Sequence, residues 1–242
     1  YLVSELENVK KELEKVCGKE ISEEAIFNSI DIYNEHRKTM REFVELAAIH
    51  PNSINNVQRS HIIKSAYFML KEEHTQKVKL INDELKKLPE EKYEGHKIVT
   101  TGFILDSKEI LEIMESNALR IVGDDIAHET RQFRTDVPFM ANPLSALAQQ
   151  WINHTACSLA FDPKKQRIQS IIDLVNHYNA EGVVLALMKF CDPEEYDVPL
   201  IMEVLREKKI PFLVIEIDQQ ATSFGQIITK VESFVDMLYT YK

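Results

Sequence analysis

Glycine is scarce in this sequence, and long apolar runs are absent. Six glycines in 242 residues argue against a glycine-rich loop of the kind that cradles a nucleotide phosphate. No apolar run approaches the roughly 20 residues that a membrane-spanning helix needs. The first residues also lack the basic and then apolar pattern of an export signal. We therefore expect a protein of the cytoplasm that does not enter a membrane.

An excess of positive charge is also absent. The chain has 29 Lys and Arg against 39 Asp and Glu, a net charge of −10, which opposes a phosphate backbone and argues against nucleic acid as a partner. Three cysteines are an odd number in a chain too large to need disulfides, so they are interpreted as free thiols or metal ligands. Tyr1 already lies in a helical pattern, which indicates a part of a longer polypeptide.

Residues 1–89 have the apolar spacing of helices throughout. Ser22 is a plausible cap for the second helix, which must end before Pro51. Two more helices are predicted at about 57–70 and 75–88. The apolar stripe of the first helix is Leu2, Leu6, Val9, Leu13 and Val16. The stripe of the second helix is interrupted only by Arg37 and consists of Ile26, Ile30, Tyr33, Met40, Val44 and Ala47.

From residue 90 onward, short apolar runs alternate with amphipathic stretches, which predicts a parallel sheet of about four strands with helices on both faces. We interpret 90–242 as one α/β domain that follows a helical segment at 1–89. The predicted strands are 98–100, 119–122, 182–187 and 212–215. The predicted helices are 107–116, 166–178, 199–208 and 226–238.

Polar residues follow three of these strands, at 123–125, 188–192 and 216–220. Because the carboxyl ends of parallel strands share one edge of a sheet, a ligand crevice is expected there. Acids at such positions are more often plain caps, however. Residues 164–167 (KKQR) form the only compact basic cluster of the α/β half. They are either a site for a phosphorylated ligand such as coenzyme A or, more often in such patterns, a solvated helix start.

The histidines carry little functional signal. His128 and His154 fall in predicted loops, whereas His36, His61 and His74 fall on predicted helices. The sequence places none of them beside a nucleophile. Each is therefore interpreted as a surface or core residue in preference to a catalytic base.

Cys191 carries more information than the other cysteines. It directly follows a predicted buried strand and precedes Asp192, which can cap a helix that has Pro193 in its first turn and Glu195 completing a capping box. A thiol at a helix N-terminus faces the positive end of the peptide dipoles, which favours the thiolate that attacks electrophiles or binds soft metals. An inert, half-buried cysteine remains the alternative.

The sequence closely resembles the 2-hydroxyacyl-CoA dehydratase and benzoyl-CoA reductase family, and within it the beta subunit of the dehydratases. The resemblance covers essentially the whole chain and is strongest around Cys191. The residues that carry it include 188–197 (MKFCDPEEYD), Pro199, 210–211 (IP), 216–220 (EIDQQ), 226–229 (QIIT) and 234–238 (FVDML). Earlier ones are 33–37 (YNEHR), 68–75 (FMLKEEHT), 124–125 (DD), 129–132 (ETRQ) and 162–165 (DPKK).

The resemblance implies a flavodoxin-like α/β fold and a heterodimer in which each subunit holds one [4Fe–4S] cluster through three cysteines. Cys191 matches the last of these three ligands. The other two are expected from an N-terminal domain that has no counterpart in these residues, and neither Cys17 nor Cys157 falls on a ligand position. We therefore expect the chain alone to be inactive.

The resemblance also implies the reaction and its partners. An ATP-dependent activator delivers one low-potential electron, and the reduced thioester, a ketyl radical anion, expels its hydroxyl group to give an (E)-2-enoyl-CoA. The expected enzyme is a dehydratase of anaerobic amino-acid fermentation that acts with an alpha subunit on an (R)-2-hydroxyacyl-CoA, for which 2-hydroxyglutaryl-CoA is the preferred candidate. A benzoyl-CoA reductase subunit and a non-catalytic assembly or binding module are the alternatives.

Overall fold

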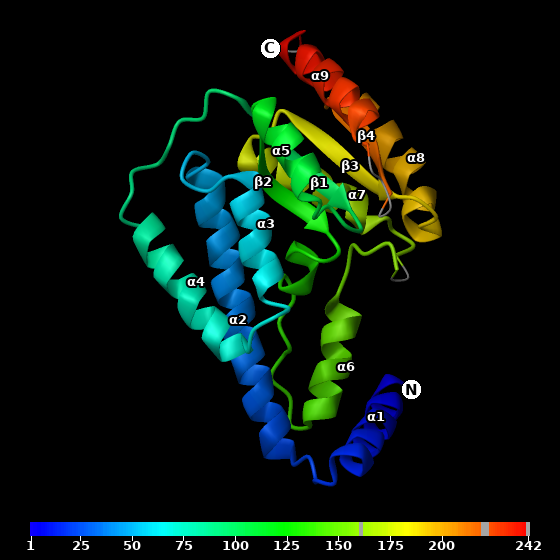
Figure 1. Cartoon of the computed structure of the whole chain (residues 1–242). Helices are drawn as coiled ribbons and strands as arrows, with labels where there is room; N and C mark the ends of the chain where they lie inside the picture. Colours follow the sequence, from blue (N-terminus) through cyan, green and yellow to red (C-terminus); the bar gives the residue numbers. More distant parts are fainter. Residues whose placement is uncertain (160–161, 219–222, 241–242) are drawn as a thin grey trace.

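The computed structural model describes residues 1–159, 162–218 and 223–240 (Figure 1). It contains a four-stranded parallel sheet with helices on both faces, preceded by helices, so the predicted α/β class is confirmed. Within the described residues, no helix has both the length and the apolar character to cross a membrane. The helical segment is α1 (Leu2–Cys17), α2 (Glu23–Ile49), α3 (Asn56–Ser65) and α4 (Lys71–Leu85). The elements that follow are β1 (His96–Gly102), α5 (Lys108–Ser116), β2 (Leu119–Ile126), η1 (Thr130–Gln132), α6 (Pro143–Asn153), α7 (Gln166–Tyr178), β3 (Gly182–Met188), α8 (Asp192–Glu207), β4 (Phe212–Ile217) and α9 (Gly225–Thr240).

The sheet has the strand order β2-β1-β3-β4 with all neighbours parallel. This is the order of the first four strands of a flavodoxin-like sheet. The chain leaves β1 through α5 toward one edge and leaves β3 through α8 toward the other. The strand order therefore reverses between β1 and β3, and the carboxyl ends of these strands mark the topological switch point.

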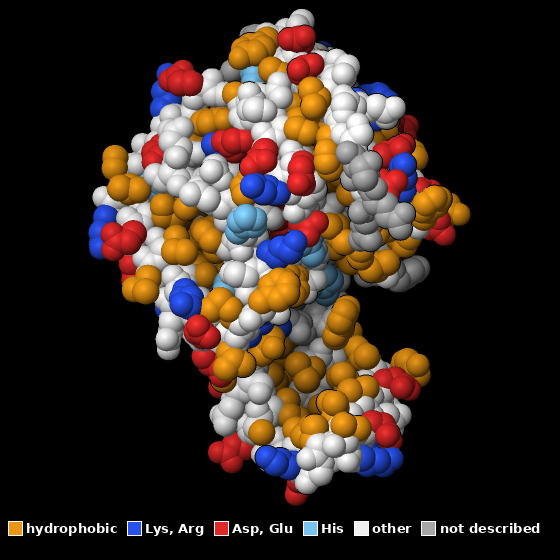
Figure 2. Space-filling view, in the orientation of Figure 1, with side chains coloured by type: hydrophobic (Ala, Val, Ile, Leu, Met, Phe, Trp, Pro, Cys, Tyr) orange, Lys and Arg blue, Asp and Glu red, His pale blue; other side chains and the backbone are white. Residues whose placement is uncertain are grey.

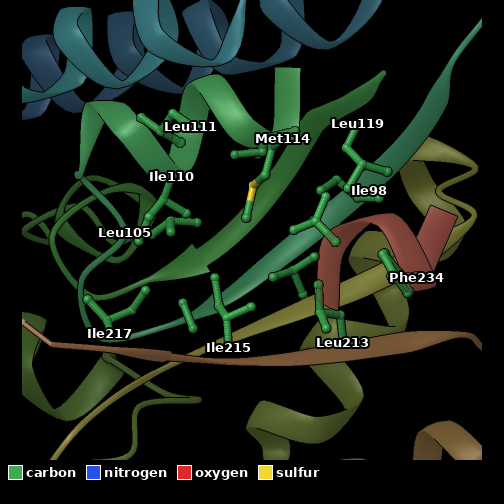
Figure 3. Packing of buried hydrophobic residues seen from close by; sticks show 14 of the residues in the cluster. Ile98, Leu105, Ile110, Leu111, Met114, Leu119, Leu213, Ile215, Ile217 and Phe234 are labelled. Carbon is green, nitrogen blue, oxygen red and sulfur yellow. The ribbon is translucent and has the colours of Figure 1, made fainter. Parts of the chain in front are cut away.

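Helices cover the two faces of the sheet in pairs. On one face, α5 and α9 pack on the strands, and Figure 3 shows Met114 of α5 and Phe234 of α9 in one apolar layer with Ile98 and Leu213 of the sheet. On the other face, α7 and α8 pack through Ile171 and other apolar side chains. Each of these buried side chains stabilises the fold by about 1.5–3 kcal/mol relative to an exposed one.

The helical segment differs from its prediction at the turn between α3 and α4. As predicted, Ser22 caps α2 by accepting a hydrogen bond from the amide of Ala25. However, α3 ends at Ser65 and α4 already begins at Lys71, so the predicted bounds of 70 and 75 are wrong. The amide of Tyr67 bonds to the carbonyl three residues before it. Lys71 Nζ donates to the carbonyl of Ala66, so this tightened turn is closed by a side chain of the next helix.

The helix predicted at 199–208 also begins earlier. α8 starts at Asp192 and continues through Pro199. Proline has no N–H, so the helix loses one backbone hydrogen bond at this position without ending. The helix start that the sequence indicated at Asp192 and the stretch predicted at 199–208 thus form one helix.

An arm projects from the sheet-bearing body in Figure 1, where α1 lies beside α6 at the far end of α2. No residue of α1 is fully buried. Much of its predicted apolar stripe faces outward, since Val9, Leu13 and Val16 are 55%, 49% and 84% exposed. Figure 2 shows apolar side chains gathered on this lower part of the molecule.

Candidate functional site

Cys191 lies at the carboxyl edge of the sheet, between the end of β3 and the start of α8. Its side chain is partly exposed. Phe190, directly before it, has a left-handed backbone with φ 65°, which turns the chain into the helix. The carbonyl of Cys191 then accepts hydrogen bonds from the amides of Glu194 and Glu195, both at 3.0 Å.

The structure corrects the predicted helix cap. Cys191 is itself the capping residue, and among the described residues no side chain makes a capping hydrogen bond there. Asp192 is the first helical residue, and the predicted capping box with Glu195 does not form. The turn at Phe190 brings the chain into helical geometry one residue earlier than the sequence indicated. The thiol consequently stands closer to the helix start than predicted.

The first turn of α8 is anchored in the protein interior by Glu194, which is 2% exposed. Its Oε2 accepts a hydrogen bond from Arg167 Nη2 at 2.6 Å, and its Oε1 accepts one from Ser158 Oγ at 2.7 Å. Arg167 is the second residue of α7. One charge-assisted contact therefore ties the start of α7 to the segment that carries Cys191.

Asp125 is the centre of this buried cluster. It lies near the end of β2, in register with Thr101 of β1, and its side chain is 1% exposed. Arg131, Arg134 and Arg167 donate to its carboxylate at 2.8–2.9 Å. Burial by itself raises the pKa of Asp125, but these arginines, Arg131 first, outweigh burial and hold the pKa below its ordinary value. Asp125 is consequently a permanent carboxylate.

A second part of the cluster surrounds Arg59 of α3, whose side chain is 4% exposed. Its guanidinium donates to the carboxylates of Asp124 and Glu129. Burial raises the pKa of Glu129 above its ordinary value, and the attraction of Arg59 only partly opposes this. The interaction joins the helical segment to the end of β2.

Five carboxylates and five basic side chains take part in the ion pairs of this cluster, so their formal charges cancel. The members are Asp124, Asp125, Glu129, Glu194 and Asp197, and Arg59, Arg131, Arg134, Lys165 and Arg167. We call this set the carboxyl-edge ion cluster.

The cluster revises two predictions. The acids predicted to follow the second strand lie within β2, which extends to Ile126, and they are not simple caps but partners of buried arginines. The basic stretch 164–167 was interpreted as a coenzyme A site or a solvated helix start. Its Arg167 is buried against three carboxylates, and Lys165 pairs with Asp197 at 2.8 Å. These two cations are therefore engaged by the protein itself. Of the predicted stretch 216–220, residues 219 and 220 lie outside the described residues.

Most histidines have structural surroundings, as predicted. His36 and His74 form a buried pair, with 3.0 Å between Nε2 and Nδ1, whereas His61 is exposed. Burial lowers the pKa of His36 to about 4, and Lys71 and His74 contribute. In the described part of the chain, no hydrogen bond joins a histidine to Cys191. The structure therefore brings no histidine base to this thiol.

A cavity of about 400 Å³ lies beside the loops that follow β1 and β2. Cys157 and His154 line it, together with Arg131 of the ion cluster. Burial lowers the pKa of His154, and Arg134 and Arg131 contribute. Its other lining residues are Tyr67, Phe103, Ile104, Ala127, His128, Gln132, Trp151 and Leu159. Sequence reasoning missed this cavity, because its walls come from four segments that are far apart in the sequence.

The three cysteines do not converge on one site. Cys17 is the last residue of α1, Cys157 follows α6, and Cys191 precedes α8. Across 1–159, 162–218 and 223–240, no group of three or more His, Cys, Asp or Glu side chains is placed to hold a metal ion. The described residues alone therefore do not supply the three converging cysteines that an iron-sulfur cluster of this kind needs. Cys191 is placed to offer one partly exposed sulfur.

Comparison with known proteins identifies the family. The model of the family described as 2-hydroxyglutaryl-CoA dehydratase, D-component, matches residues 1–238. The chain is 45% identical to the lactoyl-CoA dehydratase subunit beta of Anaerotignum propionicum, with 98% of this chain and 64% of the relative covered. It is 41% identical to the (R)-phenyllactyl-CoA dehydratase beta subunit of Clostridium sporogenes, with 98% and 63% covered. It is 40% identical to the (R)-2-hydroxyglutaryl-CoA dehydratase subunit beta of Acidaminococcus fermentans, with 95% and 62% covered.

The chain thus spans less than two thirds of the length of these curated relatives. The match nevertheless extends over nearly all of its own residues, and it includes the segment from β3 to α8 that carries Cys191. The chain therefore belongs to the 2-hydroxyglutaryl-CoA dehydratase D-component family.

Proposed function

We propose that this chain is part of the beta subunit of an (R)-2-hydroxyacyl-CoA dehydratase, a lyase that removes water from the thioester to give an (E)-2-enoyl-CoA. The proposal includes an alpha subunit as partner and an ATP-dependent activator as electron donor. It is supported by the family match and by three relatives at 40–45% identity whose names state this class of reaction.

The identities favour a dehydratase over the related reductases. A benzoyl-CoA reductase subunit of Thauera aromatica is 23% identical to the chain, far below the three dehydratase subunits. We retain 2-hydroxyglutaryl-CoA as the proposed substrate. The phenyllactyl and lactoyl relatives are at least as similar to the chain as the 2-hydroxyglutaryl relative is, so the acyl group must be decided by assay.

Cys191 carries the proposal. We propose its sulfur as one thiolate ligand of a [4Fe–4S] cluster. The other two cysteine ligands are proposed to come from a part of the full-length protein that corresponds to the unmatched part of the relatives. The partly exposed sulfur lies at the start of α8, where the peptide dipoles favour an anion. Glu194, three residues later, is held by Arg167. This contact fixes the helix start and with it the position of the sulfur.

Iron analysis of cysteine variants tests this role. The full-length protein is purified anaerobically with its partner, and iron, sulfide and visible absorbance near 400 nm are measured for Cys191→Ala. We expect a marked loss of iron with an unchanged helical circular dichroism signal. Cys17→Ala is the matched control, because Cys17 is exposed at the end of α1, and it should retain all iron. Full iron content in Cys191→Ala would remove the ligand assignment.

Anaerobic turnover decides the reaction and the acyl group. The complex and its activator are assayed with 2-hydroxyglutaryl, phenyllactyl, lactoyl and 2-hydroxyisocaproyl thioesters, and water loss is followed by formation of the enoyl product. Turnover of one of them supports the dehydratase proposal and names the substrate. Reduction of benzoyl-CoA would favour the reductase instead. A colourless full-length complex that turns over none of these thioesters would favour a non-catalytic module.

A further inference from the structure

A second, smaller cavity of about 130 Å³ lies where the helical segment meets the loop after β2. Liquid water occupies about 30 Å³ per molecule, so the space suits an ion of a few heavy atoms. Its lining comes from α2, from the turn between α3 and α4, and from the segment before and within η1.

Two cations in this lining lack an acidic partner. Arg37 and Lys71 are both only partly exposed, and neither takes part in an ion pair within the described residues. Arg37 donates through Nη1 to Asn34 Oδ1 at 3.0 Å, while its buried Nε has no hydrogen-bond partner in the described part of the chain. Lys71 donates to the carbonyl of Ala66 and has three N–H groups in all. Both side chains therefore have N–H donors that are not used within the described residues.

The acidic side chains near this cavity form ion pairs with other cations. Among the described residues, Glu129 is the only carboxylate in the cavity lining, and it accepts from Arg59 at 2.5 Å. Asp136 pairs with Arg41 at 2.8 Å. Burial lowers the pKa of Arg37, and the attraction of Asp136 opposes this only in part. Burial also lowers the pKa of Lys71, and the positive charge of Arg37 lowers it further. The protein thus holds two uncompensated positive charges at one cavity, which is costly.

The aromatic rings near the two cations do not balance their charge. Arg37 and Lys71 lie 5.7 Å and 5.8 Å from the ring centre of Tyr33. These contacts offset part of the cost of the charges but supply no negative charge. His128 Nδ1 lies 3.3 Å from the carbonyl oxygen of Phe103, to which it can only donate. A neutral imidazole then has no N–H at Nε2, so the donors for an anion are those of Arg37 and Lys71.

We propose that this cavity binds a small oxyanion, a carboxylate or phosphate group, between Arg37 and Lys71. The ion accepts the free guanidinium and ammonium hydrogen bonds and neutralises the paired positive charge. Tyr67, His128 and Gln132 line both this cavity and the larger one that contains Cys157. An organic acid therefore places its carboxylate in the small cavity and its apolar part in the larger one, whereas inorganic phosphate occupies the small cavity only. The site is separate from Cys191 and does not depend on the proposed reaction.

Thermal unfolding of the full-length protein tests the site. Phosphate, acetate and phenylacetate are each titrated against chloride at constant ionic strength, and the melting temperature is followed. We expect a saturable increase with at least one oxyanion and affinity at least about tenfold weaker in Arg37→Met and Lys71→Met. Lys79→Met is the matched control, because Lys79 lies on the same helix α4 in an exposed pair with Glu35, and it should retain wild-type affinity. A response to phenylacetate well above that to acetate indicates an organic acid, and a response to phosphate alone indicates an inorganic ion.

A crystallographic measurement covers the case in which the variants do not fold. Crystals of the wild-type protein are soaked in selenate, and the anomalous signal of selenium locates the ion. A peak between Arg37 and Lys71 supports the proposal. Absence of a peak there, or a saturable thermal shift that Arg37→Met and Lys71→Met leave unchanged, would overturn it.

Discussion

Replacing Arg167 by methionine is the most direct test of the carboxyl-edge ion cluster. Methionine keeps most of the volume and removes the charge. The substitution takes away the donors that reach Asp125 at 2.9 Å, Glu194 at 2.6 Å and Asp197 at 3.2 Å. Asp125 and Glu194 are 0% and 2% exposed, so water cannot replace the lost contacts. Removal of one partner from a buried ion pair costs about 3–5 kcal/mol, and we expect a loss of that size.

Urea unfolding followed by far-ultraviolet circular dichroism measures this loss as a lower midpoint at an unchanged slope. Lys165→Met is the control, because the Lys165 side chain is 48% exposed and contacts Asp197, a carboxylate that Arg167 also contacts. An exposed pair of this kind contributes about 0–1 kcal/mol. A second variant, Glu194→Gln combined with Arg167→Met, should recover part of the stability, because it removes a buried charge that keeps only Arg131 at 3.5 Å as a cationic partner. A loss below about 1 kcal/mol in Arg167→Met would refute the energetic role of the cluster.

Three further predictions concern the helical pair, the sheet edge and the core. His36 is neutral in the folded protein, so stability is fully present above pH 6.5 and falls as the pH approaches its folded pKa of about 4. When the pH is lowered from 7 to 5, His36 should reduce the free energy of unfolding by about 2 kcal/mol. Urea unfolding at both pH values measures this loss as the difference between the wild type and His36→Gln. Gly102→Ala should destabilise by more than about 1 kcal/mol, because Gly102 has φ 147° and an added Cβ stands 2.1 Å from the carbonyl oxygen of Ala186; equal melting temperatures would contradict this. Phe234→Ala should cost about 3–5 kcal/mol, since Phe234 is 2% exposed within the core, whereas Phe139→Ala, at 99% exposure, should leave calorimetric stability unchanged.

Hydrophobic period predicted the four strands and most helices of the fold, but not α6 or the short turn η1. Runs such as 182–187 are apolar throughout, and the structure buries them as β3 between two layers of helices. The same signal placed Cys191 at the end of a strand and before a helix. The division into two domains at residue 90 stays a prediction.

Charge pairing was not predictable in the same way. Arg59 meets Asp124 and Glu129 from 65 and 70 residues away, and no local pattern reports which charged side chains will be buried together. Arg37 is an exception, because it interrupts an otherwise apolar stripe on α2. In the structure this residue lines the small cavity. A single charge within a regular apolar period is therefore the one sequence signal that pointed to the proposed anion site.

The ion cluster also explains where chemistry can take place on this fold. Parallel α/β sheets usually bind ligands at the switch point, where the strand order reverses. Here Arg167 of α7 bridges that position, bonded to Thr101 near the end of β1 and to Glu194 in the helix that follows β3. The expected crevice is thus filled by the protein. A cavity lies beside it, at the loops after β1 and β2, and Cys191 is partly exposed at the end of β3. Because Arg167 also holds Glu194, filling the crevice and positioning the thiol depend on the same side chain.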